Sequence, residues 1–119
     1  IIPKLKKYQA DADADGYDLT VKSACSDFRI ILERTVELIL LNDVVIRFRR
    51  DVMTKGKLRG VAKVMAEDCD FIDRLMTKYS VYEHSQADEL PQVPLELDEF
   101  ERDVLELIAW IAQFKERPS

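Results

Sequence analysis

The sequence predicts an all-α protein, a bundle of four or five helices with one central, mostly apolar helix at about residues 19–41. Two observations lead to this prediction. Glycine and proline are scarce, with 3 and 4 among 119 residues, whereas sandwiches and barrels need turn residues about every 8–12 positions. Apolar residues also recur at steps of three and four along several segments, which is the spacing of one helical face.

The length and composition are those of one folded domain over residues 1–119, because hydrophobic residues make up 47% of the chain and disordered chains have far fewer. The longest apolar run, Leu38–Leu41, is much shorter than the ~20 residues of a membrane span, so we expect no membrane contact. The chain begins at Ile1 without methionine or a signal-peptide pattern, and we expect it to be a fragment of a longer protein. Residues 1–18 are expected to form a leading segment and loop, and residues 19–116 the bundle.

The first predicted helix spans residues 19–41. Ile30, Ile31 and Leu38 widen its apolar face until only a narrow polar stripe remains, and such a helix packs on two or three neighbours. Its buried face follows helical spacing through Val21, Cys25, Phe28, Leu32, Val36 and Ile39.

The middle of the chain is less regular. Residues 44–52 alternate like a strand around Phe48 but also fit a helix, and we favour a helix because no partner strand lies nearby. Gly56 and Gly60 mark a turn or weak helix, and residues 62–78 fit a helix that breaks near Ala66.

The last predicted helix follows a loop at residues 85–95 that contains Pro91 and Pro94. Asp98 followed by Glu101 forms an acidic variant of the capping box and predicts the start of the helix. Its expected buried face is Phe100, Val104, Leu107, Ile108, Ile111 and Phe114, with Trp110 beside it.

The net charge of -5 hides a strong asymmetry. Residues 44–63 carry a local charge of +6, and residues 83–106 a local charge of -8. The two segments either pack side by side, or the basic segment holds phosphate while the acidic one faces solvent or a partner. The overall acidity argues against a sequence-blind DNA-binding protein.

Several kinds of chemistry are excluded by their missing motifs. Cys25 and Cys69 are far apart, and no CxxC, HxxxH or HExxH spacing occurs, so we expect no metal. No phosphate-binding glycine loop is present, and we expect no cofactor. Two buried free thiols would suit a reducing compartment, which predicts a cytoplasmic protein.

Three residues are candidates for a polar site. His84 is the only histidine, and its side chain suits proton transfer near neutral pH, although a structural or exposed histidine is the common alternative. Arg29 and Glu33 are spaced i, i+4 on the polar stripe of the first helix. They form either an intrahelical ion pair or one wall of a polar site, and the residues alone leave both open.

Residues 25–37 (CSDFRIILERTVE) and 78–84 (KYSVYEH) resemble the HEPN superfamily of all-helical domains. More narrowly, they resemble the C-terminal anticodon-nuclease-like domain of bacterial phage-defence ATPases of the AAA/ABC type. The resemblance spans about residues 19–90. It implies an active site of Arg29, Glu33 and His84. In the superfamily's Arg-x4–6-His pattern, Lys78 stands in the place of the arginine.

The resemblance implies metal-independent cleavage of RNA, with tRNA as one substrate. His84 would act as general base or acid on the ribose 2′-hydroxyl or the leaving oxygen. Arg29, supported by Lys78, would stabilise charge on the phosphate, and Glu33 would orient Arg29 or share the proton transfer. It also implies a homodimer that holds RNA between two copies of the site, and an ATPase portion in the same longer chain. The expected RNA-binding residues are Lys78, Arg47, Arg49 and Arg50.

Two other functions fit the sequence. A non-catalytic helical dimerisation or protein-interaction domain of such an ATPase would use the acidic 83–106 segment toward a basic partner. A helical RNA-binding domain without chemistry would instead depend on Arg47 and Arg49, and its affinity would fall with salt.

Overall fold

The computed structural model describes the backbone of residues 14–84 and 95–118, and the side chains of residues 21–80 and 95–118. The helices are α2 (Ala14–Thr35), the short α3 (Leu58–Val61), α4 (Ala66–His84) and α5 (Leu97–Glu116), and α2 continues into a π-helical turn, η1 (Val36–Leu40). No strand occurs in these described ranges, which confirms the all-α fold. None of the described helices is long and apolar enough to cross a membrane.

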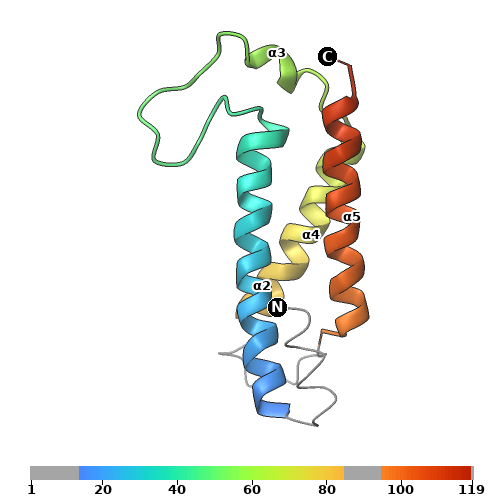
Figure 1. Ribbon diagram of the computed structural model, residues 1–119. Helices are drawn as coiled ribbons and strands as arrows, with labels where there is room; N and C mark the ends of the chain where they lie inside the picture. The colour runs from blue at the N-terminus through green and yellow to red at the C-terminus, as the bar shows by residue number, and fades with distance from the viewer. Residues whose placement is uncertain (1–13, 85–94, 119) are drawn as a thin grey trace.

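The three long helices form the body of the molecule. In Figure 1, α2 and α5 run in the same direction, and α4 passes behind them in the opposite direction. Among the long helices, α2 and α4 have the most extensive backbone contact. The chain between η1 and α3 projects from the end of α2 as a long irregular loop (Figure 1). We call residues 41–57 the projecting loop.

The core is centred on one aromatic side chain from each long helix. The ring of Phe28 lies edge-on to that of Tyr79 at 4.6 Å and to that of Phe100 at 5.8 Å, and Tyr79 lies 6.1 Å from Phe100. Edge-to-face aromatic pairs add about 0.5–1.5 kcal/mol to the stabilisation that burial supplies. The other buried members of the core are Ala24, Cys25, Leu32, Leu40, Ile72, Leu75, Leu95, Leu107, Trp110 and Phe114.

The first helix begins at Ala14 rather than near residue 19, so residues 14–18 of the predicted leading segment are helical, and residues 1–13 lie outside the described residues. Alanine is the strongest helix former, and acidic residues such as Asp15 and Asp18 favour the first turns of a helix. The C-terminal end, predicted near residue 41, agrees with the end of η1 at Leu40. The helix is less enclosed than its sequence indicates, because Ile30 and Ile31 are more than half exposed.

The predicted helix over residues 44–52 is wrong, because this segment belongs to the irregular projecting loop. Asn42, Asp43 and Phe48 have φ angles of 51°, 64° and 68°, which lie outside the right-handed helical region. Beyond the loop, the helix predicted over 62–78 begins at Ala66, at the expected break, and continues to His84.

The start of α5 also differs from the prediction. Glu96 occupies the cap position, without a side-chain cap hydrogen bond, so the predicted capping box at Asp98 is wrong. Asp98 lies in the first turn, where a negative charge favours the helix dipole. Trp110 is buried, whereas Ile108 is 58% exposed. The prediction of two buried thiols is half correct, since Cys25 is buried and Cys69 is exposed.

A buried carboxylate ties the start of α4 to the end of α5. Asp68 accepts two hydrogen bonds from the Arg117 guanidinium, at 2.6 and 3.1 Å, and one from the Trp110 indole at 3.0 Å. It also accepts one from the Met65 backbone N–H at 2.7 Å, which caps α4. Arg117 donates further to the Lys63 carbonyl at 3.0 Å. We call these five residues the Asp68 network.

Hydrogen bonding from Arg117 holds the pKa of Asp68 at about 2, against the effect of burial and below the ordinary value of 3.8. A carboxyl group whose pKa is lowered on folding stabilises the native state above its ordinary pKa. That stabilisation is lost as the pH falls through the native value. The Asp68 network should therefore weaken between about pH 4 and pH 2.

We expect Asp68→Asn to lower the free energy of unfolding by about 2 kcal/mol or more, because Arg117 loses its buried anionic partner. Urea unfolding followed by the fluorescence of Trp110, the single tryptophan, measures this change. The exposed carboxyl of Asp70 on the same helix provides the matched control, and Asp70→Asn should leave stability within about 0.5 kcal/mol. Equal stability of the two variants would contradict the role of the network.

Candidate functional site

The predicted Arg29–Glu33 pair lies where α2 meets α4. Arg29 Nε lies 3.3 Å from Glu33 Oε1, and the guanidinium also donates to the hydroxyl of Ser80 on α4. Ser80 in turn donates to the Met76 carbonyl at 2.8 Å. The side chains of Arg29 and Glu33 are each about one-quarter exposed, so this polar group is reachable from solvent.

A second arginine reaches the same carboxylate from the projecting loop. Arg47 forms an ion pair with Oε2 of Glu33, whereas Arg29 binds Oε1 of the same carboxylate. The hydrogen bond from Arg47 is the main reason that the pKa of Glu33 is lowered; burial opposes it and Arg29 adds to it. Glu33 therefore stays ionised and holds two guanidinium groups together. We call Arg29, Glu33, Arg47 and Ser80 the Arg29 cluster.

The third predicted catalytic residue, His84, is the last residue of α4. Its side chain lies outside the described residues. The backbone is informative, because α4 is helical through both positions and residue 84 follows Ser80 by one turn. Positions i and i+4 lie on one side of a helix, which is here the side that carries Ser80.

Lys78, predicted to support Arg29, lies in a different environment. It forms ion pairs with Glu99 and, at 2.6 Å, with Asp103, both on α5. Burial works against its charge, but the hydrogen bonds to Asp103 and Glu99 outweigh this effect and raise the pKa of Lys78. Positions 78 and 80 are about 200° apart around α4, which separates Lys78 from Ser80.

The surroundings of Lys78 are acidic. It lines a hollow of about 430 Å³ between α4 and α5 whose wall contains five carboxylates and three cations. A phosphate group would meet net negative charge there. The structure therefore brings Arg29, Glu33 and Arg47 together and leaves Lys78 outside the cluster.

Asp103 and Tyr79 are two important polar residues that the sequence analysis missed. The Tyr79 hydroxyl donates to Asp103 Oδ2 at 2.6 Å, and Asp103 is only 3% exposed. Burial, together with this hydrogen bond, raises the pKa of Tyr79 well above its usual range. A signal was present in the sequence, since Asp103 lies in register with the buried positions Phe100 and Leu107.

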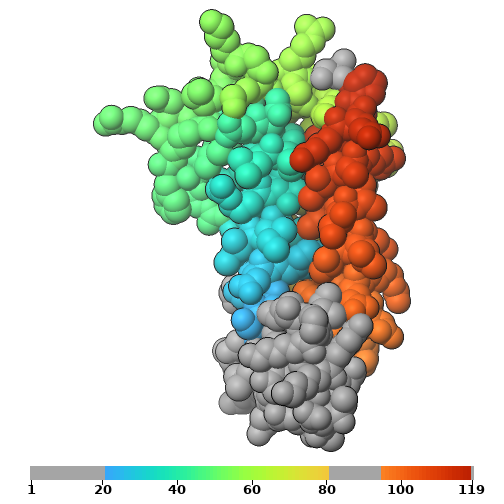
Figure 2. All heavy atoms as spheres, viewed as in Figure 1, coloured from blue at the N-terminus to red at the C-terminus, as the bar shows by residue number. Residues whose placement is uncertain are grey.

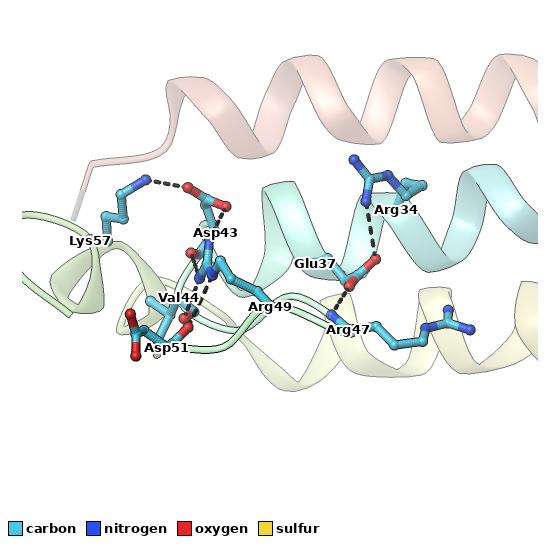
Figure 3. Close-up of polar contacts among 8 residues, drawn as sticks. All are labelled: Arg34, Glu37, Asp43, Val44, Arg47, Arg49, Asp51 and Lys57. Atoms are coloured by element: carbon cyan, nitrogen blue, oxygen red, sulfur yellow. Dashed lines mark hydrogen bonds and ion pairs between the residues drawn. The ribbon is translucent and has the colours of Figure 1, made fainter. Parts of the chain in front are cut away.

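The projecting loop is held in shape by Arg49 (Figure 3). Its guanidinium donates to the Asp43 carboxylate at 2.9 Å, to the Val44 carbonyl at 2.7 Å and to the Asp51 carbonyl at 3.1 Å. Lys57 forms an ion pair with the other oxygen of Asp43. The hydrogen bond from Lys57, followed by that from Arg49, lowers the pKa of Asp43 against the effect of burial.

The other predicted RNA-binding residues of the loop face solvent. Arg50 is exposed and has no hydrogen bond or ion pair within the described residues. Arg47 is 55% exposed despite its pairing with Glu33, and its guanidinium lies 6.0 Å from the centre of the Phe48 ring. Phe48 is 97% exposed. Of the three loop arginines, Arg49 is the one whose hydrogen bonds are used within the loop.

Comparison with known proteins finds no protein-family model that matches the chain, and no curated protein or solved structure matches it either. The likeness to the HEPN superfamily is therefore carried by the sequence motif alone. Within the described residues, no three His, Cys, Asp or Glu side chains gather in a group that could hold a metal ion.

We expect Arg49→Lys to loosen the projecting loop without unfolding the bundle, because one ammonium group cannot bind Asp43, Val44 and Asp51 at once. The Met53 amide, which donates to the Val44 carbonyl at 2.8 Å, should exchange its hydrogen about tenfold faster or more. Hydrogen exchange measures this rate. Arg50→Lys is the control, and an equal acceleration in that variant would argue against the role of Arg49.

Proposed function

We propose that this chain is a metal-independent endoribonuclease domain with an active site formed by Arg29, Glu33 and His84. The observation that carries the proposal is the contact of Arg29 with Ser80, because it joins the Arg–Glu pair of α2 to the helix that ends with His84. The Arg29–Glu33 pair and His84 are far apart in sequence, but they belong to the adjacent helices α2 and α4. This supports a single site at the α2–α4 surface.

The charges of the Arg29 cluster suit a phosphodiester. Two guanidinium groups face one carboxylate, which leaves a net positive charge at a partly exposed position. Arginine binds phosphate oxygens through paired N–H groups. Glu33, kept ionised by its two partners, would fix the orientation of Arg29.

The proposed reaction is an internal transesterification of RNA. The ribose 2′-oxygen attacks the adjacent phosphorus, the bond from phosphorus to the 5′-oxygen breaks, and the products are a 2′,3′-cyclic phosphate and a 5′-hydroxyl. His84 takes the proton of the 2′-hydroxyl while water protonates the leaving 5′-oxygen, or it gives a proton to the leaving 5′-oxygen while water takes the one from the 2′-hydroxyl. Arg29 stabilises the negative charge that develops on the phosphate oxygens. The internal nucleophile restricts the substrate to RNA.

We expect the chain to cleave tRNA in the presence of EDTA, with termini of the kind described above. Arg29→Ala should reduce the cleavage rate about 100-fold or more, and His84→Ala by a similar factor. Gel analysis of end-labelled tRNA measures both rates. The control is Arg102→Ala, which removes an exposed arginine of α5 outside the cluster and should leave the rate unchanged.

Circular dichroism establishes that each variant is folded. Cleavage by His84→Ala at the rate of the unmodified chain would exclude His84 as a catalytic residue. Absence of cleavage by the folded, unmodified chain across RNA substrates would exclude the nuclease function.

A second candidate function, RNA binding without cleavage, is favoured by Phe48. Its backbone has a φ of 68°, a costly conformation for a bulky residue, and its ring is almost completely exposed. The exposed cations Arg47 and Arg50 flank it. Aromatic rings beside cations are the platforms on which single-stranded nucleic acids stack their bases.

We expect Phe48→Ala to weaken binding of a single-stranded RNA about tenfold, since stacking contributes about 1–3 kcal/mol per base. Fluorescence anisotropy at two salt concentrations measures the affinity and its salt dependence. Val52→Ala, a change at a 61% exposed aliphatic residue of the same loop, should have no effect. Equal affinities of the two variants would argue against base stacking on Phe48. Retained binding by His84→Ala would separate binding from cleavage.

A further inference from the structure

The projecting loop exposes several large apolar side chains. Together with the residue that follows it, the loop carries five hydrophobic residues that are between 44% and 97% exposed: Val45, Phe48, Val52, Met53 and Leu58. Figure 2 shows this segment standing out from the bundle at the end of α2. Large apolar side chains gathered on one exposed segment mark an interaction surface. We call these five residues the apolar loop surface.

The loop is held in shape by its own hydrogen bonds. Its two ends are joined by the side chain of Asn42, which donates to the Lys57 carbonyl at 2.7 Å. Its two halves are joined by the Met53 amide, which donates to the Val44 carbonyl at 2.8 Å. Arg49 adds further hydrogen bonds within the loop. A surface that is already formed loses little conformational freedom when it binds.

Phe48 is the most exposed member of the apolar loop surface. Its φ of 68° is costly for a bulky side chain, and its ring is 97% exposed. Both features work against the stability of the isolated chain, and a partner that buries the ring would offset them. The other four members are not aromatic and offer no face on which a base could stack, which favours an apolar partner over single-stranded RNA.

Positive charges are interleaved with the apolar loop surface. The exposed charged residues from position 45 to position 59 are four cations and one acid: Arg47, Arg50, Lys55, Arg59 and Asp51. Most of the acidic residues of α5 lie in the first half of that helix, at the opposite end of the molecule from the loop (Figure 1). The projecting loop therefore presents positive charge and apolar side chains together, away from the main acidic segment.

We propose that the projecting loop docks on an anionic lipid bilayer. The apolar loop surface enters the boundary between the headgroups and the acyl chains, where its removal from water stabilises the bound state. Arg50, Lys55 and Arg59 stay at the level of the headgroups and attract acidic lipids. The three long helices remain in water, with the acidic start of α5 directed away from the membrane.

A bilayer fits these observations better than a folded protein partner. The apolar loop surface stands out from the molecule (Figure 2), whereas peptides and helices are bound in grooves. A fluid interface needs no matching shape. Apolar side chains combined with basic ones also provide the two signals that stable attachment to an anionic membrane requires. Such a contact differs from a membrane span, for which none of the described helices is long and apolar enough.

Membrane docking goes beyond the proposed nuclease and does not depend on it. Vesicle binding is measured without RNA, so its outcome leaves the cleavage experiment unaffected. Docking is also distinct from base stacking on Phe48. Stacking requires the ring alone, whereas docking uses the aliphatic residues as well, and Val52 therefore separates the two.

Vesicle flotation tests the proposal with the unmodified chain. Vesicles that contain phosphatidylserine should bind it about tenfold more tightly, or more, than vesicles of phosphatidylcholine alone. Val52→Ala should weaken this binding about threefold or more, because two methyl groups no longer leave water, although the same change should not affect RNA binding. Leu105→Ala, at a 65% exposed residue of α5, is the matched control and should leave vesicle binding unchanged.

Phe48→Trp reports whether the loop enters the bilayer. The emission of the introduced indole should shift to shorter wavelength with anionic vesicles and be quenched by brominated lipid, whereas Trp110 is buried in the bundle and should contribute little to the change. Absence of vesicle binding, an unchanged emission, or equal weakening by Val52→Ala and Leu105→Ala would overturn the proposal. Equal binding to both kinds of vesicle would overturn the role of the cations. Binding of single-stranded RNA by a chain that does not bind vesicles would assign the loop to RNA instead.

Discussion

The hydrogen bond from Tyr79 to Asp103 determines how α4 is rotated between α2 and α5. Both groups are almost completely buried, so either one left unpaired would destabilise the fold. With Tyr79 directed at Phe28 and Phe100, Lys78 is directed to the carboxylates of α5. Ser80 is directed to Arg29 on α2. One buried contact thus places Ser80 in the Arg29 cluster and Lys78 in the acidic hollow.

The basic segment has less free charge than its composition indicates. Arg49 and Lys57 are used to hold Asp43, and Arg47 shares Glu33 with Arg29. Of the cations that remain exposed, Arg50 and Lys55 lie on the projecting loop and Arg59 lies on the short helix α3. Arg47 could therefore contact phosphate at the Arg29 cluster on α2, whereas the positions of Arg50 and Lys55 depend on the shape of the loop.

The long helices could be predicted because helical spacing of apolar residues persists over many turns, as it does around Phe28 and Phe100. The projecting loop could not, since its conformation depends on hydrogen bonds of Arg49 to several backbone groups and on positive φ at Phe48. The helical spacing predicted Ile108 to lie on the buried face of α5, but the residue is exposed. Periodicity does not show which part of a wide apolar face is covered by a neighbouring helix. The Arg29–Glu33 pair was predictable from i, i+4 spacing, whereas its partners Arg47 and Ser80 come from distant segments.

The two cysteines are in opposite environments. Cys25 is 0% exposed within the core, whereas Cys69 lies exposed on α4. A thiol reagent will therefore modify Cys69 in the native protein at the rate of an accessible thiol and will modify Cys25 only when α2 separates from its neighbours. At a reagent concentration high enough for modification to outpace reclosing, the interval between the first and the second modification consequently reports the rate at which the bundle opens.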